Sequence, residues 1–275
     1  MVEITFLKAG YCTHPEVMVL PGGSWKPMVF PALLALICHP VGWILFDTGY
    51  SERFYQETQS LPNKLYAVLT PVYLQPQDSA VAQLEQLGIA PEDIKYIIIS
   101  HFHADHIGGL KDFPQAKFIC FESGYNAIKN KRGFQALKAG FLSGLMPDNF
   151  EKRVVFVENH HTLKLPENFQ PFEWGFDLFG DGSLIAIELP GHAVGQMGLY
   201  LTDNRGKQYF LIADACWLNR AYQELIYPQR IADILFADKT AYRETLKKIN
   251  QLYRNNPDVK IIPSHNSIDL TEIGQ

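Results

Sequence analysis

The chain has 275 residues, of which 47% are hydrophobic and 19% charged, and its formal net charge is −5. This composition is typical of a globular protein with a substantial core, and it lacks the basic footprint of a nucleic-acid-binding protein. The longest apolar run, 28–38, is too short to span a bilayer and is interrupted by Pro31, and the first residues do not resemble a signal peptide. We therefore expect a cytoplasmic protein that acts on a small molecule, with no nucleic-acid or membrane partner. The four cysteines form no CxxC pair, so we expect buried thiols rather than disulfides.

The first part of the chain is predicted to consist of strands. Residues 2–7, 29–37 and 43–46 form apolar or alternating runs bounded by turn-forming residues. Residues 50–77 are rich in aromatic residues, proline and glutamine, with weak periodicity. We expect this second segment to cross the surface rather than to join the core.

The middle of the chain alternates helix and strand. Asp78 is predicted to cap a helix that ends at Gly88. A nearly continuous apolar run, 94–99, indicates a strand buried on both faces. Another strand is predicted at 117–121, followed by an irregular helical stretch with several glycines at 122–150.

The last part repeats the order of strands followed by a helix. The predicted strands are 153–157, 184–189, 197–202 and 208–213. A helix then carries Tyr242, Leu246, Ile249 and Tyr253 on one face, and a strand follows at 259–262. Strands that cluster before a helix, twice, predict two β-rich halves that pack sheet against sheet and are covered by helices. With no linker visible, we expect one domain over residues 1–275.

The most informative segment is 100–109, Ser-His-Phe-His-Ala-Asp-His-Ile-Gly-Gly. It places His101, His103, Asp105 and His106 within six positions. Imidazoles and carboxylates crowded in this way pack poorly in a core, but they are ordinary ligands of divalent metals. The segment follows the predicted strand 94–99, so its ligands would be rigidly supported at a strand end. We predict a metal site here.

Other ligand-type residues follow apolar strands in the same way. Asp47, His192, Asp214 and His265 each come just after such a strand. Taken singly, each of these histidines could be a hydrogen-bonded structural residue, and each aspartate a turn or cap residue. Together with the 101–106 segment, His192, Asp214 and His265 become candidate ligands. The remaining histidines are interpreted as surface or loop residues: His14, His39, His160 and His161.

The order of these residues resembles that of the metallo-β-lactamase fold superfamily. The resemblance covers nearly the whole chain and implies an α+β fold, an αββα four-layer sandwich of two mixed sheets flanked by helices. It implies one metal held by His101, His103 and His192, a second held by Asp105, His106 and His265, and Asp214 bridging them. By the same resemblance Asp47 would lie behind the ligands and orient an imidazole.

The implied chemistry is hydrolysis. Two divalent ions, zinc first and manganese, iron or cobalt as alternatives, would share a bridging hydroxide and polarise the substrate oxygen. Asp105 would orient that hydroxide and carry its proton. A non-catalytic metal-binding sensor and an iron-dependent oxidoreductase are the alternatives from other classes.

A narrower resemblance concerns the substrate. Residues 176–183, leading to the Gly191-His192 pair, resemble acyl-homoserine lactonases and the related organophosphate hydrolases, although a Gly/Asp turn between two strands would also explain this segment. Gln196 replaces a second histidine of those enzymes, and Trp217 replaces a tyrosine, so both are candidate substrate-binding residues. We expect a small lactone or ester as substrate, with a glyoxalase II-like thioesterase or a phosphotriesterase as alternatives. The segments 50–77 and 124–150 are predicted to form pocket walls or a homodimer contact.

Overall fold

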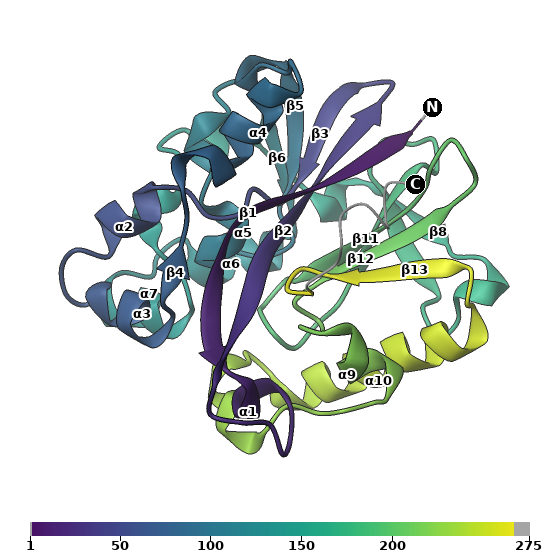
Figure 1. The fold of residues 1–275 in the computed structure, drawn as a ribbon. Helices are drawn as coiled ribbons and strands as arrows, with labels where there is room; N and C mark the ends of the chain where they lie inside the picture. Colours follow the sequence, from purple (N-terminus) through teal and green to yellow (C-terminus); the bar gives the residue numbers. More distant parts are fainter. Residues whose placement is uncertain (1, 267–275) are drawn as a thin grey trace.

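The computed structural model describes residues 2–266, and its strands form two β-sheets (Figure 1). The first sheet has seven strands, in the order β4-β1-β2-β3-β5-β6-β7. Their bounds are β1 (Glu3–Pro15), β2 (Pro27–His39), β3 (Gly42–Phe46), β4 (Val72–Tyr73), β5 (Ile94–Ile98), β6 (Lys117–Cys120) and β7 (Val154–Phe156). The pairs among β1, β2 and β3 are antiparallel, whereas β3, β5, β6 and β7 run parallel, so the sheet is mixed.

The second sheet has six strands, in the order β13-β12-β11-β10-β9-β8. Their bounds are β8 (His161–Lys164), β9 (Trp174–Asp177), β10 (Leu184–Glu188), β11 (Met197–Thr202), β12 (Gln208–Ala213) and β13 (Val259–Pro263). Only the β12–β13 pair is parallel within this described sheet. The second sheet is therefore mixed as well.

The alternation of side chains along β10 shows why two sheets and helices stack in layers. Leu184 and Ala186 belong to a core that also contains residues of the first sheet. Ile185 and Ile187, which point to the opposite face, belong to a second core with Leu246 of α10 (Lys239–Asn255). Because successive strand residues face opposite sides, one strand contributes to both cores.

Helices cover the outer faces of the sheets. The helices besides α10 are α1 (Glu16–Val19), α2 (Arg53–Glu57), α3 (Lys64–Leu69), α4 (Ala80–Gln86), α5 (Ala104–Ile107), α6 (Glu122–Ile128), α7 (Gly133–Lys138), α8 (Phe150–Arg153) and α9 (Asn219–Gln223). In Figure 1, α4 lies beside β5, while α9 and α10 lie below the second sheet, on the far side of the molecule from α4. The predicted αββα sandwich of two mixed sheets is thus confirmed.

Several predicted details differ from the structure. Ser79 rather than Asp78 caps α4, since the Ser79 side chain accepts a hydrogen bond from the backbone N–H of Ala82. The segment 50–77 is not a simple surface crossing, because it contains two short helices and fully buries Tyr50 and Phe54. Tyr253 is 38% exposed, so it does not share the buried face of α10.

Further predictions from the sequence concern the segment 122–150, the cysteines, membrane-spanning helices and the number of domains. The irregular helical stretch at 122–150 is confirmed and resolves into α6, α7 and a short turn before α8. All four cysteines are free. Within residues 2–266, no helix has the length and apolar character that crossing a membrane requires. The single domain over 1–275 stays a prediction, and its ends, residue 1 and residues 267–275, lie outside the described part.

Candidate metal centre

Seven candidate ligands meet at the strand ends of both sheets. The first sheet supplies the segment after β5, with His101 and His103 in the loop and Asp105 and His106 on α5. The second sheet supplies His192 beyond β10, Asp214 after β12 and His265 after β13. The structure brings all seven predicted ligands together, in two groups that share one residue.

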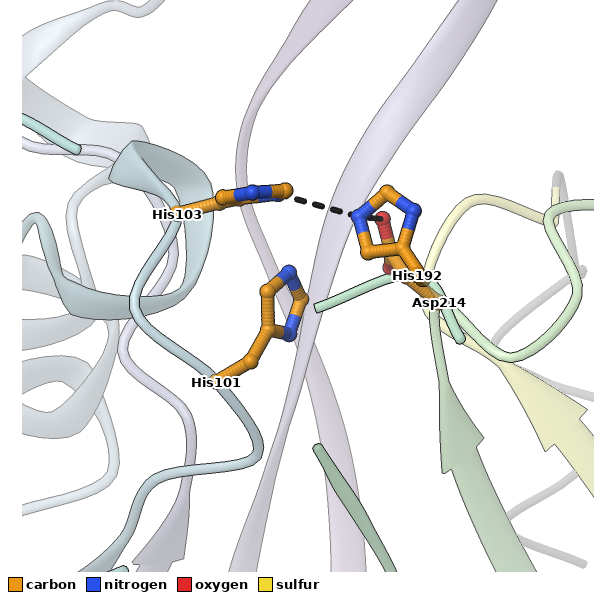
Figure 2. A group of neighbouring side chains, drawn as sticks. All are labelled: His101, His103, His192 and Asp214. Atoms are coloured by element: carbon orange, nitrogen blue, oxygen red, sulfur yellow. Dashed lines mark hydrogen bonds and ion pairs between the residues drawn. The ribbon is translucent and has the colours of Figure 1, made fainter. Parts of the chain in front are cut away.

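The first group is His101, His103, His192 and Asp214, and its ligand atoms all lie within 4.8 Å of one another. Nε2 of His192 lies 2.9 Å from Nδ1 of His103 and 3.2 Å from Oδ2 of Asp214. Figure 2 shows that these side chains, which come from different sheets, point toward a common centre. Such convergence of three imidazoles and one carboxylate is what a divalent ion requires.

The second group is Asp105, His106, Asp214 and His265, and its ligand atoms also lie within 4.8 Å of one another. Nε2 of His265 lies 3.1 Å from Oδ2 of Asp214 and 3.3 Å from Oδ2 of Asp105. Nε2 of His106 lies 3.3 Å from Oδ1 of Asp214. Asp214 therefore touches both groups, one carboxylate oxygen reaching His192 and His265 and the other reaching His106.

Asp47 lies behind the ligands, as predicted. Its backbone has a φ of 61°, and its N–H donates to the carbonyl of Ile98, which ties the end of β3 to β5. Its Oδ1 accepts a hydrogen bond from the N–H of Ser100 at 2.8 Å, and its Oδ2 accepts from the Ser100 hydroxyl at 2.8 Å. Oδ2 also accepts from Nδ1 of His106 at 2.7 Å, which leaves Nε2 of that ring for the centre.

Two further imidazoles are fixed by their outer nitrogens. Because the Ser100 hydroxyl proton goes to Asp47, its oxygen is free to accept from Nδ1 of His101, 3.1 Å away. Nδ1 of His265 donates to the carbonyl of Pro31 on β2 at 2.9 Å. In each ring Nε2 is left to face the centre.

The electrostatics of the centre favour a cation. Burial lowers the pKa of His101 well below its ordinary value and that of His192 to about 3, so both rings are neutral. Burial alone would raise the pKa of Asp214, but nearby His265 and His106 hold it well below its ordinary value. Among residues 2–266 the buried carboxylates are those of three aspartates, and no lysine or arginine is buried to balance them.

Unpaired polar atoms show that the residues fit a metal. Nε2 of His101, Nε2 of His106 and Oδ1 of Asp214 are buried and make no hydrogen bond with any part of the chain that the structure describes, although the last two lie 3.3 Å apart. Leaving buried polar atoms without a partner costs about 1–3 kcal/mol each. All three atoms face the groups described above and are of the nitrogen and oxygen type that zinc and related ions bind.

The centre forms the floor of a cavity of about 900 Å³. His103, Asp105, His192, Asp214 and His265 line it. Its walls are mostly apolar, and they include residues of α1, α3, α6, α7 and the 3-10 helix η7 (Arg230–Leu235): Met18, Val19, Leu69, Ile128, Leu137, Ile234 and Leu235. The predicted wall segments 50–77 and 124–150 both contribute lining residues.

The two candidate substrate-binding residues differ in position. Trp217 lines the cavity, but its indole N–H donates to Oδ2 of Asp214 at 3.2 Å. Gln196 is fully buried, donates to the carbonyl of Leu189, and does not line the cavity. We therefore correct the expectation for Gln196, which supports the loop before His192 instead of facing a substrate.

Two of the histidines expected on the surface or in loops, His14 and His39, lie instead on strands and away from the open surface. His14, at the end of β1, lines the cavity with its ring 5.9 Å from that of Phe30. His39 is buried and its Nε2 lies 2.7 Å from the Ser183 hydroxyl, where it packs the turn 177–183. His14 was missed because the β1–β2 pairing, a long-range feature, carries it over the centre. Of the other two, His161 is exposed and His160 is half-buried.

Comparison with known proteins places these observations in a family. The family model of the metallo-beta-lactamase superfamily matches residues 29–210. A probable metallo-hydrolase of Mycobacterium bovis, Mb2322c, is 37% identical over 264 residues, covering 88% of this chain and 78% of its own. The N-acyl homoserine lactonase AttM of Rhizobium radiobacter is 26% identical over 245 residues, covering 88% of this chain and 84% of its own.

A solved structure shares the fold. It is an N-acyl homoserine lactone hydrolase with N-hexanoyl-L-homoserine bound at its catalytic metal centre. It matches with a TM-score of 0.73 and 18% identity, over 96% of this chain and 93% of its own.

Proposed function

The chain belongs to the metallo-beta-lactamase superfamily, and we propose that this metallo-hydrolase opens small lactones or esters at a two-metal centre. The observation that carries the proposal is the pair of ligand groups that share Asp214 on the floor of an apolar-walled cavity. The lactone part of the proposal is supported by the likeness to the lactonase AttM.

We infer that His101, His103 and His192 would hold one ion and that Asp105, His106 and His265 would hold the other, with Asp214 available to both. Zinc suits this mixture of imidazole and carboxylate, while manganese, iron and cobalt accept the same donors. When bound, two such ions would polarise a substrate carbonyl and lower the pKa of the attacking water toward neutrality.

The side chains of this protein contribute positioning and proton transfer. Asp105 lines the cavity and lies between His106 and His265, so its carboxylate is placed to accept a proton from the attacking water. In the balanced reaction the water oxygen adds to the carbonyl carbon, the acyl carbon–oxygen bond breaks, and that proton passes to the leaving oxygen. Trp217 holds Asp214 in place through its indole N–H.

The cavity favours an apolar acyl group next to the reacting carbonyl. Its volume of about 900 Å³ lies in the range of small-molecule sites. Met18, Leu69, Ile128 and Leu235 would remove such a group from water. We infer that Trp217 contacts the substrate as part of the cavity wall, with its ring rather than its N–H facing the ligand.

The experiment that tests the proposal is a hydrolysis panel. Lactones, aryl esters, thioesters and phosphotriesters are offered to metal-replete protein purified without chelator, and Asp214→Ala serves as the inactive control. We expect turnover of lactones or esters that the control lacks. Turnover of thioesters or phosphotriesters alone would replace the proposed substrate class, and no turnover by a folded, metal-loaded protein would overturn the proposal. The expected homodimer and cytoplasmic location stay predictions.

A further inference from the structure

We infer that the preferred substrate carries an anionic group, such as a carboxylate, at the end of its acyl part remote from the scissile bond. Lys131 and Lys138 would bind that group. The inference rests on the proposed function, because it assumes that the scissile carbonyl sits at the His/Asp centre. It concerns the wall of the same cavity that α7 and the residues before it form.

The first support is the charge of the lining. Beyond the imidazoles and the aspartates of the centre, the charged residues that line the cavity within residues 2–266 are Lys131 and Lys138. No glutamate, arginine or further aspartate of that part of the chain lines it. The whole chain has a net charge of −5, whereas the lining away from the centre carries the positive charge of these two lysines alone. A wall with positive charge alone attracts anions.

The second support is the arrangement of these lysines on one wall. Lys138 is the last residue of α7 and Lys131 lies just before that helix. Gln135 also lines the cavity, three positions before Lys138, and residues at this spacing share one face of a helix. Phe134, which does not line the cavity, is 67% exposed. The segment therefore contributes two lysines and a glutamine to one wall of the cavity.

The third support is that both ammonium groups are unpaired. Neither Lys131 nor Lys138 forms an ion pair or a side-chain hydrogen bond with another residue in the described part of the chain. Arg132 lies between them in the sequence, but its guanidinium already donates hydrogen bonds to the backbone carbonyls of Lys129 and Lys131. A ligand anion would therefore not have to displace a carboxylate of the protein.

The wall and the centre are in direct contact. Gly140, two residues after Lys138, has a φ of +63°, and a Cβ placed on it would lie 2.5 Å from Cδ2 of His103. The chain that carries the lysines thus passes against a ligand of the first group. A substrate whose carbonyl is at the centre can extend along this wall, with its acyl chain on the apolar residues and its anionic end at the lysines.

A matched pair of esters tests the inference. p-Nitrophenyl hexanoate and the mono-p-nitrophenyl ester of adipic acid differ only by a terminal methyl group against a terminal carboxylate. Wild-type enzyme should hydrolyse the adipate ester with the higher kcat/KM, and added salt should reduce that preference. Equal kcat/KM for both esters, or a preference for the hexanoate, would overturn the inference.

The variants are Lys131→Met, Lys138→Met and the double variant, with Lys129→Met as the control. Lys129 is exposed on the same segment but does not line the cavity. Each cavity lysine should account for about a 3- to 10-fold change, seen in KM for the adipate ester, as a charge-assisted contact does. Any change in KM for the hexanoate should be smaller than for the adipate ester in the cavity variants, and Lys129→Met should leave both esters unchanged. An equal loss for both esters, or the same loss in the Lys129 control, would contradict the inference.

If neither ester is hydrolysed, a binding measurement tests whether the two lysines bind an anionic group. The proposed function is defeated only if the lactones and other esters of the panel are not hydrolysed either, and in both cases calorimetric titration with adipic acid monomethyl ester tests the lysines separately. Binding to the wild type that the double variant lacks would support the inference. Equal binding to both proteins, or no binding to either, would overturn it.

Discussion

Oδ2 of Asp47 lies 2.7 Å from Nδ1 of His106, and the two side chains are 0% and 1% exposed. The same carboxylate accepts the Ser100 hydroxyl, whose oxygen lies 3.1 Å from Nδ1 of His101. One buried aspartate that does not line the cavity thus orients an imidazole in each ligand group. It acts directly on the second group and through Ser100 on the first.

Replacing Asp47 should weaken the binding of both ions. Asp47→Asn keeps the shape but loses the charge that holds the outer nitrogen of His106, so we expect metal affinity to fall about 10- to 100-fold. Ser100→Ala should weaken the binding of the ion beside His101 more than the binding of the other ion. Metal retained against rising chelator concentration gives the measurement. Asp112→Asn, which removes a carboxylate paired with Arg53, is the control and should retain the wild-type metal content.

The indole of Trp217 offers a second test. Trp217→Phe keeps an aromatic wall but removes the N–H that reaches Asp214 at 3.2 Å. We expect kcat to fall about 5- to 10-fold, because the shared carboxylate loses an orienting hydrogen bond, while KM changes little. Steady-state kinetics on the best lactone or ester of the panel measures this. A change in KM alone would instead mean that Trp217 serves only as a wall of the cavity.

Gly140 should be intolerant of a methyl group. A Cβ there would lie 2.5 Å from the ring of His103 and would also meet the strain of a φ of +63°. Gly140→Ala should therefore displace His103 and lower kcat/KM by about tenfold or more. Gly180 has a φ of +78° with open space around it, so Gly180→Ala bears the same backbone strain without the contact. Comparable losses of activity in the two variants would show that the contact with His103 is unimportant.

Removing the metal should destabilise the fold. Ions bound at about a hundred to a thousand times their dissociation constant contribute about 3–4 kcal/mol to stability, which corresponds to a Tm change of about 10 °C in a chain of this size. Burial would lower the pKa of His106, yet Asp105 and Asp47 raise it well above its ordinary value, so without metal this ring holds a proton that an ion must displace. The gain in Tm on adding zinc should consequently be larger at pH 8 than at pH 6. A thermal scan that shows no shift after chelation would contradict the account.

The centre was predictable because its signals are local. Each ligand follows a short apolar strand, and the carboxyl ends of such strands meet at one edge, so the seven residues could be assembled from the sequence alone. The segment from His101 to His106 also contains a dense cluster of ligand-type residues, and such a cluster has few functions other than metal binding. The structure brings these residues together as two groups that share Asp214.

The features that the sequence analysis did not predict correctly depend on contacts between segments that are distant in the sequence. β8 is exposed along its whole length, so it shows no hydrophobic alternation and was not predicted. Tyr50 and Phe54 are buried, the ring of Phe54 packing against Tyr66 of α3, and His14 reaches the cavity through the β1–β2 pairing. Gln196 follows the motif of a ligand loop in sequence, yet packing turns it into the core.

Metal titration of the metal-free protein tests the two-metal centre most directly. Zinc is added in known molar ratios, and both bound metal and hydrolysis of the best panel substrate are followed. We predict that activity reaches its maximum at about two ions per chain in the wild type, and that His106→Ala binds about one with little activity. Full activity at one ion per chain, or activity in His106→Ala equal to that of the wild type, would contradict the account.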